Sequence, residues 1–430
     1  MLSSTRGTCL ETISCCLDSI DQSTLNAFIT VDPVAARIVA TYCDLVASRG
    51  GSLGVLHGMP IAVKDLIDVA GFATTAGSRQ HLGSVAHLDA TVIRRLRAQG
   101  ALILGKTNTH EFAYGSTGDN SHFGAVLNPH DSARISGGSS SGSAAAVAAG
   151  LCAAALGTDT SASIRIPAAL CGVVGMKPTY GLVPLDGVFE LSRTLDHVGP
   201  LTRDVRTNAL MLEVLAEVPG AYTQGIGRSV QGLRVGRVHR FYGAHISGAV
   251  REALARGFDV LKKAGADIVD IDIPEIEDIY NAQQLILKAE AFAQHQKSIG
   301  EAKSYSPEVL DRLLTGRDIP AREYLDCVRF RSEAVAAFDG ALSGLDCILT
   351  PTSGIVAPPL QERRTTVEGV ELSTFQLLTR LTAPTNFSGH PSLSVPFGRS
   401  DGLPIGLQLI GHRMGEATLY QIASRLETAC

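Results

Sequence analysis

The segment from residue 135 to residue 172 constrains the fold more than any other part of the chain. It reads ISGGSSSGSAAAVAAGLCAAALGTDTSASIRIPAALCG, so two serine-containing turns flank an Ala-rich apolar run. A flexible Gly/Ser linker would continue into polar sequence, but here Ser143 opens a helical pattern and residues 151–156 continue as apolar chain. We therefore expect both serine turns to lie inside a folded domain.

The first Gly/Ser turn has two functional interpretations that rest on local sequence. A phosphate-binding loop would present backbone N–H groups to an anion, but G-x-x-x-x-G-K-[ST] is absent, as is G-x-G-x-x-G after a strand. Residues 138–142 fit the G-x-S-x-G elbow of α/β-hydrolases, which requires a buried strand before it. The preceding NPHDSARISG is polar and contains Pro129, although His390 is late enough to serve as a triad histidine.

A third interpretation uses both serine turns. A helix over residues 141–151 would rise about 16 Å, and an extended return over residues 152–156 would cover roughly the same distance. This path brings Ser139 beside Ser163. Two hydroxyls form a proton relay only if a base accepts the final proton, and no histidine is near in sequence.

Lys64 is the candidate base, because it follows the apolar strand pattern of residues 61–63. The alternative is a surface lysine that pairs with the neighbouring Asp65. An unperturbed lysine has a pKa of about 10.4, so catalysis requires that burial lower this pKa.

Short apolar runs alternate with helical patterns along the chain. Helical periodicity occurs near residues 8–20, 33–47 and 89–99, and strand-like runs occur at residues 61–63, 101–104, 233–238, 266–271, 347–349, 393–395 and 405–410. The alternation predicts an α/β fold with one central, mixed, twisted sheet covered by helices on both faces. Residues 352–373 lack such a pattern and are predicted to form an exposed loop.

Charge and hydropathy exclude several classes of protein. The 37 basic and 42 acidic residues give a net charge of −5 without a run of five Lys or Arg, which argues against a direct nucleic-acid partner. No apolar stretch reaches the roughly 18 to 20 residues that cross a bilayer, and the first twenty residues lack a signal-peptide pattern. We expect a cytoplasmic protein without membrane contact, whose scattered cysteines are reduced.

Five sequence blocks occur in the order of a known family. They are GMPIAVKDLIDVAG around Lys64, GKTNTHEFAYG at residues 105–115, GGSSSGSAAAVAAG from Gly137, GTDTSASIRIPAALCG from Gly157 and GLPIGLQLIG from Gly402. Together these blocks, which cover much of the chain, resemble the amidase signature family.

The resemblance implies a role for each matching residue. Lys64 corresponds to the base, Ser139 to a bridging serine in a cis peptide, and Ser163 to the nucleophile. The oxyanion hole corresponds to Thr160, Ser161, Ala162 and Ser163. Asp159 and Arg165, which flank the nucleophile, and Ser140 are expected to support the turns, and Tyr114 and Gly115 are expected to line the substrate pocket, with ordinary packing as the alternative for Tyr114. The chain departs from the family at Ser161 and Ala162, where a Gly pair is common, and a Cβ there is strained if the turn requires positive φ.

The implied activity is hydrolysis of a small-molecule amide through an acyl-enzyme, without a metal or organic cofactor. The implied organisation is a single amidase domain over residues 1–430, with a family core at about 50–215 and 385–430 and a variable substrate-side region at about 230–380. The alternatives are a carbamate or urea-derivative hydrolase, a glutaminase-like A subunit of an amidotransferase, and a non-catalytic scaffold. The A subunit would need partner subunits, whereas an amidase could work as a homodimer.

Overall fold

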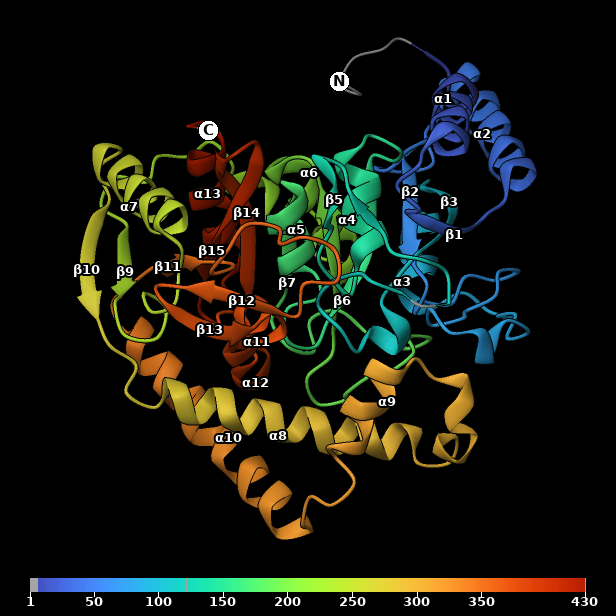
Figure 1. Ribbon diagram of the computed structural model, residues 1–430. Helices are drawn as coiled ribbons and strands as arrows, with labels where there is room; N and C mark the ends of the chain where they lie inside the picture. The colour runs from blue at the N-terminus through green and yellow to red at the C-terminus, as the bar shows by residue number, and fades with distance from the viewer. Residues whose placement is uncertain (1–6, 121, 430) are drawn as a thin grey trace.

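The structure, a computed structural model, describes residues 7–120 and 122–429 (Figure 1). The main-sheet strands are β1 (Phe28–Val31), β2 (Pro60–Lys64), β3 (Leu102–Thr107), β6 (Ala154–Asp159), β7 (Val174–Lys177), β8 (His197–Thr202), β9 (Arg234–Val238), β10 (Asp267–Ile271), β11 (Cys347–Pro351), β14 (Ser392–Ser400) and β15 (Leu403–Ile410). Their order in this 11-stranded sheet is β1-β3-β2-β6-β8-β7-β14-β15-β11-β9-β10. Short hairpins are formed by β4 (Leu127–Asn128) with β5 (Asp131–Ile135) and by β12 (Arg364–Val367) with β13 (Val370–Ser373).

Helices surround this sheet (Figure 1). They are α1 (Cys9–Gln22), α2 (Pro33–Ser48), α3 (Thr91–Ala98), α4 (Ser141–Ala148), α5 (Arg165–Cys171), α6 (Val205–Ala216), α7 (Gly248–Lys263), α8 (Ile276–His295), α9 (Pro307–Leu314), α10 (Ala321–Leu342), α11 (Thr374–Thr379), α12 (Ala383–Ser388) and α13 (Glu416–Glu427). Single 3₁₀ turns lie at Arg79–His81, Glu111–Ala113 and Thr223–Gly225, and a longer one at Ile299–Ser304.

Strand β2 illustrates why both faces of the sheet are covered. Ile61 and Val63 point into one hydrophobic core, which they share with α3, α6 and α13, whereas Ala62 points into another core, shared with α1, α2 and α4. The strand pairs in parallel with β3 and β6, and β6 pairs antiparallel with β8. The predicted α/β fold with a mixed sheet between two helical layers is therefore confirmed.

Most predicted elements are present with small shifts at their ends. The patterns at residues 8–20, 33–47 and 89–99 became α1, α2 and α3, and the helix predicted for residues 141–151 ends earlier, as α4 at Ala148. Residues 352–373 are not loop throughout, because the β12–β13 hairpin lies within them. Helices α8 and α10 pack on each other at one end of the sheet (Figure 1). None of the described helices is both long and apolar enough to cross a membrane.

Candidate active site

Lys64 is the last residue of β2 and is completely buried. Its Nζ atom donates hydrogen bonds to Ser139 Oγ at 2.7 Å and to Thr158 Oγ1 at 2.8 Å. Burial lowers the pKa of Lys64 to about 7, although the nearby carboxyl groups of Asp159 and Asp196 act in the opposite direction. A buried strand end thus presents an amine that is substantially neutral near pH 7.

Ser139 lies in the turn before α4, and the Gly138–Ser139 peptide bond is cis, as the resemblance implied. The Ser139 carbonyl accepts hydrogen bonds from Thr109 Oγ1 at 2.9 Å and from the His110 N–H at 3.3 Å. The segment that follows β3 therefore holds the backbone of this turn.

Ser163 lies in the second serine turn, between β6 and α5. The Ser140 N–H donates to the Ser163 carbonyl at 3.1 Å, so the two serine turns are in direct contact. The Ser140 hydroxyl joins the first turn to β6, because it donates to the Thr158 carbonyl at 3.2 Å and accepts from the Thr158 N–H at 3.3 Å. The out-and-back path through α4 and β6 brings the two serine turns together, and the end of β2 places Lys64 against the first of them.

A buried ion pair shapes the second turn. Arg165 Nε and Nη2 donate to the two carboxylate oxygens of Asp159 at 3.0 and 2.9 Å, and Nη2 also donates to the Ser161 carbonyl at 3.2 Å. Burial would raise the pKa of Asp159, but the Arg165 guanidinium outweighs it and holds this pKa well below its usual value. A bidentate pair of this kind fixes the direction of the turn.

The turn leaves several backbone donors free. Within the described part of the chain, the N–H groups of Ser161, Ala162 and Ser163 have no hydrogen-bond acceptor. Neither Ser161 nor Ala162 is among the non-glycine residues with positive φ, so their side chains cause no strain of that kind. Free N–H groups next to a candidate nucleophile are suited to stabilise an oxyanion.

Sequence reasoning missed two residues that hold this turn from outside. Gln283 on α8 donates from Nε2 to Ser161 Oγ at 2.7 Å and to the Thr160 carbonyl at 3.1 Å. Asp196 accepts a hydrogen bond from Thr160 Oγ1 at 2.6 Å, and burial raises its pKa to about 7. No local signal could have identified Gln283, because 122 residues separate it from Ser161.

A small, partly open cavity of about 20 Å³ lies beside Ser163. Its lining consists of residues 113–116 and 160–163 together with Leu191, Leu287, Phe375 and Thr379. The predicted residues Tyr114 and Gly115 are therefore part of the wall. An added Cβ at Gly115 would lie 2.2 Å from His110 Nε2, so a glycine there allows the histidine ring to pack behind the wall.

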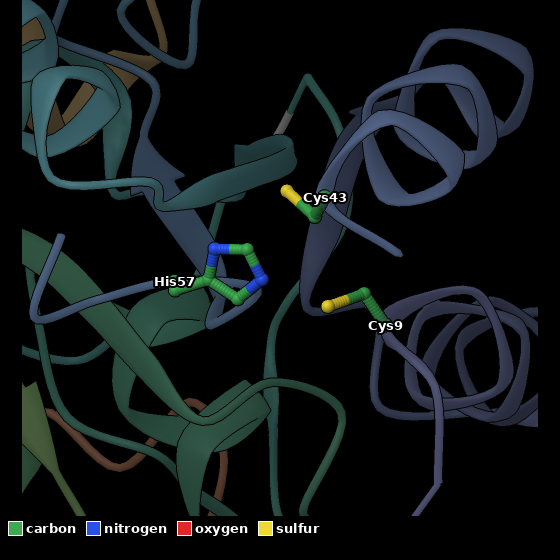
Figure 2. A group of neighbouring side chains, drawn as sticks. All are labelled: Cys9, Cys43 and His57. Atoms are coloured by element: carbon green, nitrogen blue, oxygen red, sulfur yellow. The ribbon is translucent and has the colours of Figure 1, made fainter. Parts of the chain in front are cut away.

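One group of potential metal ligands occurs among the described residues, and it lies away from this site. Figure 2 shows Cys9, Cys43 and His57, whose ligand atoms lie within 4.8 Å of one another. His57 Nδ1 accepts the Leu53 N–H at 3.1 Å, so the ring proton of neutral His57 is on Nε2, the nitrogen that faces the two sulfur atoms. A protonated nitrogen has no lone pair for a metal, and this group does not fit one.

Comparisons with known proteins agree with this geometry. The family model described as Amidase matches residues 11–420. The A subunit of the glutamyl-tRNA(Gln) amidotransferase of Koribacter versatilis (strain Ellin345) is 37% identical, and the alignment covers 94% of this chain and 91% of that protein.

Solved structures are equally similar along the whole chain. A crystal structure of an amidase aligns with a TM-score of 0.93 and 36% identity, covering 99% of this chain and 96% of its own. A bacterial aryl acylamidase of the amidase signature enzymes family aligns with a TM-score of 0.90 and 26% identity, covering 99% and 93%. The match over nearly the full length means that this chain belongs to the amidase signature family.

Proposed function

We propose that the chain hydrolyses a linear, non-peptide carboxamide, with Ser163 as nucleophile, Ser139 as proton relay and Lys64 as base. The observation that carries this proposal is the 2.7 Å hydrogen bond between Lys64 Nζ and Ser139 Oγ in a fully buried position. Burial lowers the pKa of Lys64 to about 7, so a large fraction of the amine is available as a base near neutral pH.

The hydrogen-bond partners of Lys64 suit this role. A neutral amine has two N–H bonds and one lone pair. When one N–H donates to Thr158 Oγ1, the lone pair can be directed at the Ser139 hydroxyl, which in turn accepts the proton of Ser163. The oxygen of Ser163 attacks the substrate carbonyl, and the same relay returns the proton to the leaving nitrogen. Water then releases the acyl group from Ser163.

The second turn supplies the electrostatic part of the mechanism. We propose that the free N–H groups of Ser161, Ala162 and Ser163, together with that of Thr160, form the oxyanion hole. The Arg165–Asp159 pair shapes the second turn, the hydroxyl of Ser140 fixes the first turn to β6, and Tyr114 and Gly115 line the space for the substrate. No step in this scheme requires a metal or an organic cofactor.

Labelling with a fluorophosphonate, followed by a hydrolysis screen of simple amides, tests the assignment. We expect Ser163→Ala to abolish labelling and turnover, and Lys64→Met to lower kcat by at least about 1000-fold. The matched control is Lys106→Met, because Lys106 is a second buried lysine on the neighbouring strand β3 and pairs with Asp65 at 2.9 Å. Full activity in folded Lys64→Met, or equal losses in both lysine variants, would contradict the proposed base.

A glutaminase-like A subunit is the second candidate, because the similar protein of Koribacter versatilis is named as a subunit of an amidotransferase. Such a protein would depend on partner chains. Efficient amide hydrolysis by the purified chain alone, with its mass measured by light scattering, would argue against it. A carbamate or urea-derivative substrate is distinguished when carbamates and ureas are added to the hydrolysis screen. A homodimer and a cytoplasmic location stay predictions from the sequence.

A further inference from the structure

The cavity beside Ser163 is lined without any Asp, Glu, Lys, Arg or His among its described residues. One wall, residues 113–116, is Ala-Tyr-Gly-Ser, and the opposite wall, residues 160–163, is Thr-Ser-Ala-Ser. Leu191, Leu287, Phe375 and Thr379 complete the lining. The side chains available to an acyl group are therefore apolar groups and hydroxyls.

Two cations directly behind this lining, Arg312 and Arg165, already have partners. Arg312 donates to the Tyr114 carbonyl at 2.6 Å, is bonded to Glu308, and lies with its guanidinium carbon 4.7 Å from the ring centroid of Phe375. On the other side, the Arg165 guanidinium is fully used by Asp159, the Ser161 carbonyl and residues of α12 and β15. Neither cation is free to receive a carboxylate from the cavity.

These surroundings discriminate between acyl groups by charge. L-Glutamine carries an ammonium and a carboxylate, and inside the cavity each would lose water to a lining that offers no opposite charge. Burying unpaired ions costs far more than burying alkyl or aryl groups, which gain contact with Leu191, Leu287 and Phe375. The hydroxyls of the lining can orient the amide itself, which is uncharged.

We propose that the site selects amides with an uncharged acyl group and discriminates against L-glutamine. This inference rests on the proposed function and separates the chain from a glutaminase. Leu287 serves as the contact that limits the size of the acyl group. It lies one helical turn after Gln283 on α8, so the helix that holds the Ser161 turn also closes the cavity.

The decisive comparison is between L-glutamine and 4-methylpentanamide, which has methyl groups in place of the ammonium and the carboxylate. We expect kcat/KM to favour 4-methylpentanamide by at least about 100-fold. Equal or better turnover of L-glutamine would overturn the inference while it supports amide hydrolysis at Ser163.

Calorimetric titration of the same two amides into Ser163→Ala protein reads acyl recognition without turnover. Tighter binding of 4-methylpentanamide than of L-glutamine supports the inference, whether or not the wild-type protein hydrolyses either amide. Failure of the wild-type protein to hydrolyse either amide would contradict the proposed function. Tighter binding of L-glutamine, or equal binding of the two amides, overturns the inference.

A pair of leucine variants tests whether this cavity receives the acyl group. Leu287→Ala enlarges the cavity and is expected to raise the kcat/KM ratio of 4-methylpentanamide to acetamide by about tenfold. Leu285→Ala, on the same helix but outside the lining, should change this ratio less than about twofold. If both variants leave the ratio unchanged while circular dichroism reports folded protein, the acyl group binds elsewhere and the inference fails.

Discussion

At the scale of single residues, the proposed chemistry depends on a lysine that the fold places out of contact with water. Lys64 is fully buried, and its amine is held between two hydroxyls, those of Ser139 and Thr158. The family motifs predicted Lys64, Ser139 and Ser163 as one site, and their catalytic roles stay a prediction. The sequence did not reveal the partners Thr158 and Asp196, whose roles depend on how strands from different parts of the chain pair.

The lowered pKa of Lys64 predicts a pH profile. Because the neutral amine is the active form, kcat/KM should rise with pH, reach half of its maximum near the pKa of about 7, and stay level above it. Initial rates between pH 5.5 and pH 9 would measure this. A profile that is flat across this range, with folded protein throughout, would contradict a Lys64 base.

The same shift predicts how stability changes with pH. Since the folded-state pKa is about 7 and an unfolded lysine titrates near about 10.4, the unfolded chain binds more protons between these values. The free energy of unfolding should therefore gain a contribution from Lys64 as pH rises from about 7 to about 10. Urea unfolding at pH 7 and pH 9.5 should show a larger gain for wild-type protein than for Lys64→Met, in which burial still lowers the pKa of Lys106 and of Lys177.

At the scale of secondary-structure elements, helix α8 supports the turn that carries Ser163. Its residue Gln283 donates to both Ser161 and Thr160, so the hydroxyl at the position where the family often has glycine is used as an acceptor. The sequence predicted the turn and its unusual Ser161. It did not predict that Gln283 is the hydrogen-bond partner of Ser161, because residue 283 belongs to a region without family motifs. Strand β8 was missed for another reason: HVGPLT contains Gly199 and Pro200, which are uncommon in central strands.

Gln283→Leu should impair catalysis because it removes the hydrogen bonds by which α8 holds the Ser163 turn. Leucine retains much of the volume but makes neither hydrogen bond, so the oxyanion turn loses its outer anchor and kcat should fall about tenfold with little change in KM. In a Ser161→Gly background, which has already lost one acceptor, the loss caused by Gln283→Leu should be smaller. The control is Gln294→Leu, an exposed position on the same helix with no bond to the turn, which should change kcat less than about twofold.

Steady-state kinetics of the two single variants and the double variant check the coupling. Equal losses for Gln283→Leu in both backgrounds would mean that Gln283 does not act through Ser161. A loss confined to KM would instead assign Gln283 to substrate binding.

At the scale of the whole molecule, the site is assembled from segments that are distant in sequence. Strands β3, β2 and β6 are neighbours in the sheet. The sequence motifs of the first half of the chain lie on or next to these strands, so they predicted residues that the sheet places close together. The walls that close the cavity come from α8 and α11, in the half of the chain that carries few motifs, so the closure could not be predicted. The organisation of residues 1–430 as one domain stays a prediction.

Arg363, the residue before β12, connects the β12–β13 hairpin with helix α9 and with the segment that contains Asp119. Its guanidinium donates to Asp119 at 2.8 Å and to Glu308 of α9 at 3.0 Å, next to the β12–β13 hairpin. Arg363→Ala should increase hydrogen exchange in α9 while lowering the free energy of unfolding by less than about 1 kcal/mol, since this pair is partly exposed. Arg364→Ala, which breaks only the neighbouring bond to Glu371, is the control and should leave exchange in α9 unchanged.

The size of the cavity beside Ser163 bears on the motions that substrate entry and product release require. A space of about 20 Å³ has room for roughly one water molecule, and even the smallest amide is larger. The cavity is partly open, so a widening of the gap between Leu287 and Phe375 would admit an amide and let the acid leave. Where such a movement is slower than the bond cleavage, the movement and not the chemistry limits turnover.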